Sequence, residues 1–144
     1  MKRIKRKVLA YITKGEGRHR KLLVYEQTDQ PEAGLQVPGG TIERNELLLD
    51  ALYREIEEES GILRDELILE GKVKSSKFFP EDKNVIYERT IFHFSYVGKE
   101  ETNEWEYRVE GEGKDAGLLF SYRWMPLNAV PKLAAKQGEA IEYI

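Results

Sequence analysis

Cysteine is missing altogether from this 144-residue sequence. Its absence excludes disulfides, thiolate nucleophiles and cysteine-based zinc sites. Long apolar runs are missing as well, since no stretch approaches the roughly 18 residues needed to span a bilayer. No signal-like apolar segment follows the basic start of the chain. We therefore expect a protein with no membrane partner, and the cytoplasm is its expected location.

A large excess of one charge sign is also lacking. The formal net charge is -3, with 34% charged and 40% hydrophobic residues, a balance typical of one soluble globular domain. The local exception is the start, where Lys2, Arg3, Lys5, Arg6 and Lys7 are basic. Such a run can bind nucleic acid or phospholipid, but charge runs are more often solvated tails. A nucleic-acid partner is therefore the less favoured interpretation.

Alternating and β-branched segments predict several strands separated by polar, glycine-containing turns. The expected strands cover residues 8–13, 21–25, 67–73, 85–97 and 118–124. The sequence shows no internal repeat and no linker long enough to separate two domains. Together with the helices considered next, this order predicts one α/β or α+β domain with a mixed sheet, over residues 1–144.

A helical period is predicted for residues 45–59. Asn45 is suited to be the N-cap of this helix, and Gly61 is placed to end it. Just before it, Pro38-Gly39-Gly40 predicts a sharp turn. A second, short helix is expected at residues 127–136. The order of elements is therefore strands, helix, strands, helix.

The first predicted helix carries an apolar stripe that leads directly to Glu55. At about 100° per residue, Leu48, Ala51 and Leu52 all fall within about 60° of Glu55. Such a stripe normally packs against the core of a domain. Glu55 is therefore expected to point inward, at the edge of the core.

Two more glutamates share this inward direction. Glu58 and Glu59 lie within about 60° of Glu55, whereas Glu57 falls on the solvent face. Like charges at these spacings repel, and more strongly when they are desolvated, so a bound cation would stabilise the cluster. Carboxylates suit an oxygen-preferring ion such as Mg²⁺ or Mn²⁺. The alternative is a solvated acidic helix end, although acidic residues there oppose the helix dipole.

The residues around this helix resemble the Nudix box at every fixed position. Gly40 is followed after five residues by Glu46, and after seven more by Arg54-Glu55-Ile56-Glu57-Glu58-Glu59-Ser60-Gly61-Ile62. Nine positions across 23 residues agree, which is far more specific than a short glycine motif. The resemblance implies a single Nudix hydrolase domain, an α/β/α sandwich with a mixed β-sheet.

By this resemblance, the chain hydrolyses a pyrophosphate linkage in a nucleoside diphosphate joined to another moiety, using Mg²⁺ or Mn²⁺. Glu55, Glu58 and Glu59 are the implied metal ligands, together with the Gly40 carbonyl. Arg54, Glu55 and Glu58 are the implied catalytic residues, with Arg54 orienting the glutamates. A divalent ion suits this chemistry because it neutralises phosphate charge and lowers the pKa of bound water.

Other site residues stay open at the level of sequence. Glu46 belongs to the box but faces away on the helical wheel, so we expect it to support the loop. The general base is either a box glutamate or a glutamate of the acidic segment 100–115. Four candidates lie in that segment: Glu104, Glu106, Glu110 and Glu112. The segment predicts a long mobile loop or a hairpin, and we hypothesise that it closes over the nucleotide with Trp105 or Tyr107 stacked on the base.

The substrate stays open among an oxidised nucleotide, a nucleotide sugar and a dinucleoside polyphosphate. Pro80 lies near, but not at, the spacing typical of ADP-ribose hydrolases. Two rival functions are a non-catalytic nucleotide-sensing module and an RNA 5'-end pyrophosphohydrolase that uses the basic N-terminus. The expected partner is a small nucleotide substrate, and a homodimer is an open alternative.

Overall fold

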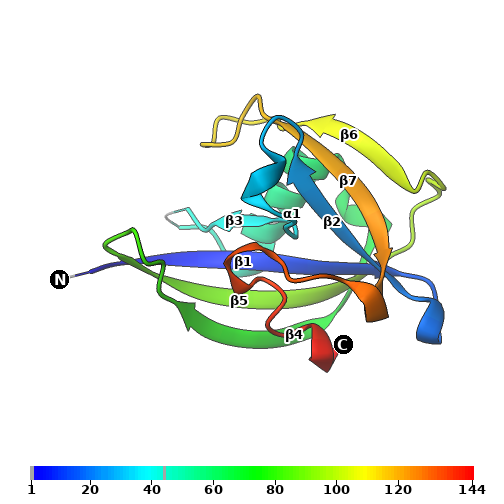
Figure 1. Cartoon of the computed structure of the whole chain (residues 1–144), viewed down its shortest axis with the longest axis horizontal. Helices are drawn as coiled ribbons and strands as arrows, with labels where there is room; N and C mark the ends of the chain where they lie inside the picture. Colours follow the sequence, from blue (N-terminus) through cyan, green and yellow to red (C-terminus); the bar gives the residue numbers. More distant parts are fainter. Residues whose placement is uncertain (1, 44) are drawn as a thin grey trace.

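The computed structural model describes residues 2–43 and 45–144, and β-strands dominate it (Figure 1). The strands are β1 (Arg3–Lys14), β2 (Lys21–Gln27), β3 (Gly39–Thr41), β4 (Leu67–Phe78), β5 (Val85–Tyr96), β6 (Glu104–Arg108) and β7 (Leu119–Pro126). They form one sheet in the order β4-β5-β1-β2-β7-β6, with β3 paired to β1. β1 and β5 run parallel, whereas the other pairs are antiparallel. The mixed sheet of a single α/β domain is therefore confirmed.

One α-helix, α1 (Leu48–Ser60), lies between two parts of this sheet. β1 pairs with β2 only near its end, at Thr13 and Lys14, and with β3 nearer its start. β2, β7 and β6 therefore diverge from β1, β5 and β4. In the angle between them, α1 contacts β1 and β3 as well as β6 and β7 (Figure 1). Both parts of the sheet thus hold the helix in place.

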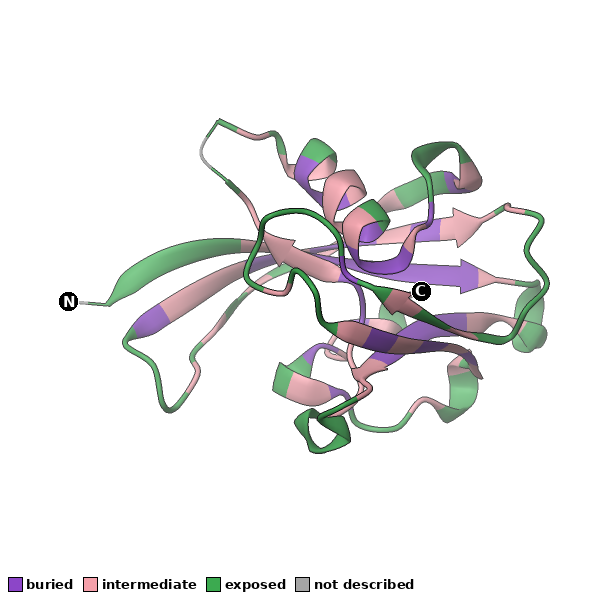
Figure 2. Cartoon of the chain, turned by 90° about the horizontal axis from the view of Figure 1, so that it is seen from above, coloured by how far each residue is buried: buried purple, intermediate pink, exposed green. Residues whose placement is uncertain are grey.

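The apolar face of α1 is largely the one that the helical period predicts. Ala51, Leu52 and Ile56 are fully buried. Figure 2 shows that the helix ribbon alternates between buried, intermediate and exposed segments. Ile56 lies about 100° from Glu55 on the wheel, outside the predicted stripe. It is nevertheless buried because the two parts of the sheet cover the helix from two sides. The buried arc is therefore wider than a single packed face requires.

The helix begins later than predicted but ends where predicted. Asn45 is not its N-cap: the Asn45 backbone is left-handed, with a φ of 70°, and Leu47 occupies the cap position without a side-chain hydrogen bond. At the other end, Gly61 has a φ of 80°, and its N–H donates to the Glu57 carbonyl at 2.9 Å. A Cβ at Gly61 would lie 2.6 Å from the Tyr107 ring. Conformation and space therefore both require glycine there.

Two segments predicted as turn or loop pair as strands. Gly39 and Gly40, predicted as a sharp turn, belong to β3 and pair with β1. Within the acidic segment 100–115, residues 104–108 form β6 and pair with β7, so the hairpin alternative is the correct one. In both segments the strand conformation results from pairing with a neighbouring strand, and the local turn preferences of the sequence do not predict such pairing.

The second predicted helix, at residues 127–136, is wrong. The segment contains two separate 3-10 turns, η4 (Leu127–Ala129) and η5 (Ala134–Lys136). Pro131 lies between them, lacks an N–H to donate, and disfavours helical backbone in the residue before it. Ala135 also has a left-handed backbone, with a φ of 51°. The second helical layer of the expected sandwich is therefore built from short turns.

These C-terminal turns cover the second face of the sheet. Leu133 and Ala140 are buried against Tyr11, whose hydroxyl donates to the Gln137 carbonyl at 2.6 Å. The remaining 3-10 turns are η1 (Gly17–His19), η2 (Pro31–Ala33), η3 (Arg64–Glu66) and η6 (Ile141–Tyr143). Among residues 2–43 and 45–144, no helix is both long enough and apolar enough to cross a membrane.

We predict that Ile56→Ala lowers the free energy of unfolding by about 2–5 kcal/mol, because it leaves a cavity between α1 and the sheet. The control is Leu47→Ala, since the Leu47 side chain is 72% exposed. That substitution should change the free energy of unfolding by less than about 0.5 kcal/mol. Urea denaturation measures both values. Equal losses in the two variants would contradict the packing described for Ile56.

Candidate active site

Arg54 joins three glutamates on one side of α1. Its Nε and Nη2 donate to the two carboxylate oxygens of Glu46 at 2.8 and 2.9 Å, which makes a bidentate pair. Its Nη1 donates to Glu55 at 3.0 Å and to Glu58 at 3.3 Å. The hydrogen bonds to Glu46 are the main cause that raises the pKa of Arg54, and they lower the pKa of Glu46 in turn. Arg54 therefore fixes the positions of the Glu55 and Glu58 carboxylates.

Glu46 has the supporting position predicted for it. Its carboxylate accepts hydrogen bonds from Arg54 and from the Glu43 backbone N–H, the latter at 3.1 Å. The side chain thus ties the segment before α1 to the middle of the helix. A charge-assisted bidentate bond of this kind gives orientation as well as energy.

Glu59 is buried despite its charge, with only 3% of its surface exposed. The Gly39 N–H donates to its carboxylate at 3.2 Å, and the Glu55 carboxyl lies within hydrogen-bonding distance of it. None of the ion pairs among the described residues includes Glu59. Burial first, and then the charge of Glu55, raises the pKa of Glu59 well above its ordinary value. The site therefore holds negative charge that no lysine or arginine offsets directly.

Glu55 lies beside Glu59 and against the backbone of β3. Burial raises the pKa of Glu55, and the charge of Arg54 opposes that shift. A Cβ at Gly40 would come within 2.3 Å of the Glu55 Cδ, so a larger residue could not occupy this position unless the carboxylate moved. Gly40, Glu55 and Glu59, all predicted as site residues, are therefore neighbours in the fold.

Glu58 faces the segment of residues 109–117, which lies in the loop between β6 and β7. The Glu110 N–H donates to the Glu58 backbone carbonyl at 2.9 Å, and a Cβ at Gly111 would lie 2.7 Å from the Glu58 Cδ. The loop is thus in close contact with the last turns of α1. Glu57, predicted to be an ordinary surface residue, is exposed.

The chemistry of these donors fits a hard divalent cation. Within the part of the chain that the structure describes, no three acidic or histidine side chains already converge on one point. Glu55 and Glu59 adjoin each other, whereas Glu58 is held by Arg54. A cation would offset the repulsion that raises the pKa of Glu59, and Mg²⁺ and Mn²⁺ prefer carboxylate oxygens. Glu55 and Glu59 are therefore the residues best placed to hold such an ion.

The three glutamates line a cleft of about 820 Å³. The same cleft is lined by five basic residues that the sequence did not assign to a site. We call them the cationic group, and they are Arg3, Lys5, Lys7, Lys83 and Lys114. The basic start of the chain thus belongs to an ordered strand, β1, and is not a tail, although residues 3–6 are exposed to solvent as expected. The run of basic residues was the one sign in the sequence that this segment could belong to a site. Its pairing with β5 could not be predicted from the composition of the run.

Of the four glutamates considered as general bases in the segment 100–115, Glu110 alone lines this cleft. Its carboxylate accepts a hydrogen bond from the Tyr107 hydroxyl. Asp115, which the sequence did not single out, lines the cleft too, and its charge contributes to the raised pKa of Glu59. The remaining candidates do not line the cleft: Glu104, Glu106 and Glu112.

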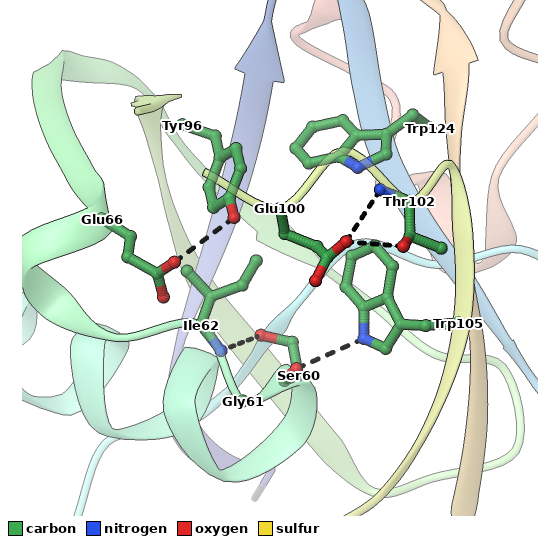
Figure 3. Close-up of a pocket in the computed structure, with 9 residues that line it drawn as sticks. All are labelled: Ser60, Gly61, Ile62, Glu66, Tyr96, Glu100, Thr102, Trp105 and Trp124. Carbon is green, nitrogen blue, oxygen red and sulfur yellow. Dashed lines mark hydrogen bonds between the residues drawn. The ribbon is translucent and has the colours of Figure 1, made fainter. Parts of the chain in front are cut away.

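Trp105 lies outside this cleft. It lines a separate pocket of about 320 Å³ at the C-terminal end of α1, together with Tyr96 (Figure 3). Its indole N–H donates to the Ser60 carbonyl at 3.4 Å, and its ring stacks on Tyr122 with centroids 5.1 Å apart. Trp105 therefore does not face the glutamates, and its stacking on the base of a bound nucleotide stays a prediction. Its position on β6 directs the ring toward the core.

Comparison with known proteins agrees with this geometry. The sequence model of the NUDIX domain matches residues 3–144. A search of curated proteins found no match. Three similar solved structures show a shared fold, at identities too low to show more. A C. elegans Ap4A hydrolase in a binary complex has a TM-score of 0.70 and 15% identity, covering 96% of this chain and 93% of that one.

The other two structures are bacterial. A MutT NUDIX hydrolase from Burkholderia pseudomallei has a TM-score of 0.61 and 20% identity, covering 99% of this chain and 98% of that one. The E. coli dihydroneopterin triphosphate pyrophosphohydrolase has a TM-score of 0.64 and 20% identity, covering 98% of this chain and 96% of that one.

We predict that the metal-free protein loses stability as the pH rises from 4.5 toward neutrality. The pKa of Glu59 in the folded chain is raised above its ordinary value of 4.5. In that range the folded chain binds more protons than the unfolded chain, so unfolding becomes easier as the pH rises. Urea unfolding in a chelator measures this slope. Glu59→Gln should flatten it and Glu57→Gln should not; an unchanged slope in Glu59→Gln would contradict the prediction.

Mg²⁺ should raise the melting temperature, because an ion that binds the folded carboxylates stabilises the folded state by mass action. Thermal unfolding at increasing Mg²⁺ concentrations measures the shift. The Glu55→Gln/Glu59→Gln double variant should lose the shift, whereas Glu57→Gln should retain it. A shift of the same size in the double variant would mean that the ion binds elsewhere.

Proposed function

This chain belongs to the Nudix hydrolase family, and we propose that it cleaves a pyrophosphate linkage in a nucleoside diphosphate joined to another moiety, using Mg²⁺ or Mn²⁺. The observation that carries the proposal is the buried Glu59 carboxyl beside Glu55, without a basic partner of its own. A buried charge of this kind is costly unless something compensates it. Such an arrangement is expected of a site that binds a cation during its working cycle.

Each predicted site residue has a role that its contacts support. Glu55, Glu58 and Glu59 would hold the ion, with the Gly40 carbonyl as a further ligand. When bound, the ion would neutralise phosphate charge and lower the pKa of the attacking water. Arg54 acts as a positioning residue, because one guanidinium binds both Glu55 and Glu58. Its bidentate bond to Glu46 keeps it from turning away.

The proton of the attacking water would pass to a carboxylate at the rim of the cleft. Glu58 is available on α1, while Glu110 and Asp115 are available on the loop of residues 109–117. All three lie within the last turns of the helix or in the segment packed against it. The cleft therefore brings the metal ligands and the candidate proton acceptors together.

Catalysis is better supported than nucleotide sensing without turnover. A sensing module has no need to keep the glutamates of the box, whereas here all of them are present and the inward ones line one cleft. The Arg54 contacts also hold Glu55 and Glu58 in defined positions, as catalysis requires.

We predict that Glu59→Gln lowers kcat for pyrophosphate hydrolysis by at least about tenfold, roughly 1.4 kcal/mol in the barrier. The substitution keeps the shape of the side chain and removes its charge. Glu57→Gln, two residues away on the exposed face of the helix, should change kcat little. Steady-state release of the nucleoside monophosphate in the presence of Mg²⁺, followed by chromatography, measures both. Equal losses would contradict the assignment of Glu59 to the site.

A further inference from the structure

We infer that the cationic group binds a chain of three or more phosphates, so that the substrate class is a nucleoside triphosphate or a dinucleoside polyphosphate. The inference rests on the proposed hydrolysis and narrows its substrate. It starts from the unusual composition of the cleft, in which basic residues line the same cavity as the glutamates. A cation at the glutamates accounts for the acidic residues and leaves the basic ones unexplained.

Three of these basic residues form a row along β1. Arg3, Lys5 and Lys7 are alternate residues, so their side chains leave the same face of the strand. Lys7 pairs with β3 next to Gly40, whereas Arg3 pairs with Val85 at the start of β5. At about 3.3 Å per residue, the row spans about 13 Å. It therefore runs from the glutamates outward along the cleft, as a linear polyanion would.

Lys7, at the inner end of the row, is held in place. Its Nζ donates to the Thr41 hydroxyl at 2.6 Å and lies 5.0 Å from the centroid of the Tyr87 ring. Burial lowers the pKa of Lys7, while Tyr87 and Glu55 act in the opposite direction. A half-buried ammonium group without an acidic partner gains stability from a bound anion. Its position next to β3 would place that anion beside the glutamates.

The cationic group as a whole is not neutralised by the protein. Within residues 2–43 and 45–144, none of its five members forms an ion pair with a carboxylate. By contrast, Arg64, Lys74 and Arg89 elsewhere in the chain each pair with an acid. Because these basic side chains are not engaged in ion pairs, they attract anionic ligands to their part of the cleft, although acidic residues line it as well.

The position of this charge distinguishes between substrates. A nucleotide sugar carries two phosphates, so once these lie at the glutamates its neutral sugar would extend along the row on β1. A polyphosphate would instead place further negative charge at Lys5 and Arg3. Lys83 adds to the same region, since its Nζ donates to the Tyr87 hydroxyl at 3.5 Å. The matching of charge along the whole row therefore favours the polyphosphate.

Diadenosine compounds with two to five phosphates test this inference, because they differ only in the number of phosphates. With Mg²⁺, kcat/KM should rise at least about tenfold from two phosphates to four. In Arg3→Gln/Lys5→Gln this ratio should fall below about threefold. The matched control, Arg18→Gln/Lys72→Gln, removes the same charge from exposed positions outside the cleft and should keep the full ratio. The same ratio in both double variants, or no rise in the parent chain, would overturn the inference.

A binding measurement separates this inference from the proposed hydrolysis. Glu59→Gln is titrated calorimetrically with inorganic pyrophosphate and with inorganic tripolyphosphate. Tripolyphosphate should bind at least about fivefold more tightly, and adding Arg3→Gln/Lys5→Gln should remove the difference. If the parent chain hydrolyses neither the diadenosine compounds, nor ATP, nor a nucleotide sugar, the proposed function fails and this preference decides the inference alone. Hydrolysis with no dependence on phosphate number overturns the inference and leaves the function standing.

An RNA oligonucleotide with a 5'-triphosphate tests the nucleic-acid alternative. Values of kcat/KM equal to or below that for ATP would support the inference, because the row on β1 then recognises phosphates alone. A preference for the RNA of about tenfold or more, with a steep dependence on salt, would overturn it in favour of a nucleic-acid end.

Discussion

Two carboxyl groups of the same helix lie against each other where the core ends, and much of the local structure serves to keep them there. Glu59 is buried and Glu55 adjoins it, so the charge of Glu55 adds to the effect of burial in raising the pKa of Glu59, while burial raises the pKa of Glu55. Such a pair would separate or take up protons if the surroundings allowed. The apolar face of α1, packed between two parts of the sheet, prevents the separation. The site is therefore strained electrostatically by the same packing that stabilises the domain.

Both backbone and side-chain contacts hold the Glu55 and Glu59 carboxyl groups in position. On the inner side, the Gly39 N–H binds Glu59, and the lack of a side chain at Gly40 leaves room for Glu55. On the outer side, Arg54 binds Glu55 and is itself anchored by a carboxylate from before the helix. The Arg54 guanidinium and the single Gly39 N–H compensate the negative charge of the Glu55–Glu59 pair only in part. This partial compensation leaves capacity for a metal ion and for the phosphates that accompany it.

Periodicity predicted most of this arrangement, and long-range pairing accounts for what it missed. The helical wheel placed Glu55 and Glu59 inward because the 3.6-residue repeat is local. The wheel did not place Ile56 on the buried face. Ile56 is buried because a second part of the sheet covers the helix, and a helical wheel carries no information on that contact. Likewise, the charged residues at the start of β1 hid its strand pattern. That segment belongs to the sheet because it pairs with β5, which is distant in the sequence. The position of Trp105 was missed for the same reason, since the pairing of β6 with β7 sets the direction of its ring.

The parallel pairing of β1 with β5 also affects how the chain comes to be folded. Arg3 pairs with Val85, 82 positions later, so β1 has no parallel partner until β5 has been synthesised. Contacts this distant in sequence slow folding and prolong the lifetime of unpaired strand edges. Charged residues on such an edge discourage association with other chains. The basic residues of β1 are therefore of the kind that discourages an unpaired strand edge from associating with other chains, in addition to lining the cleft.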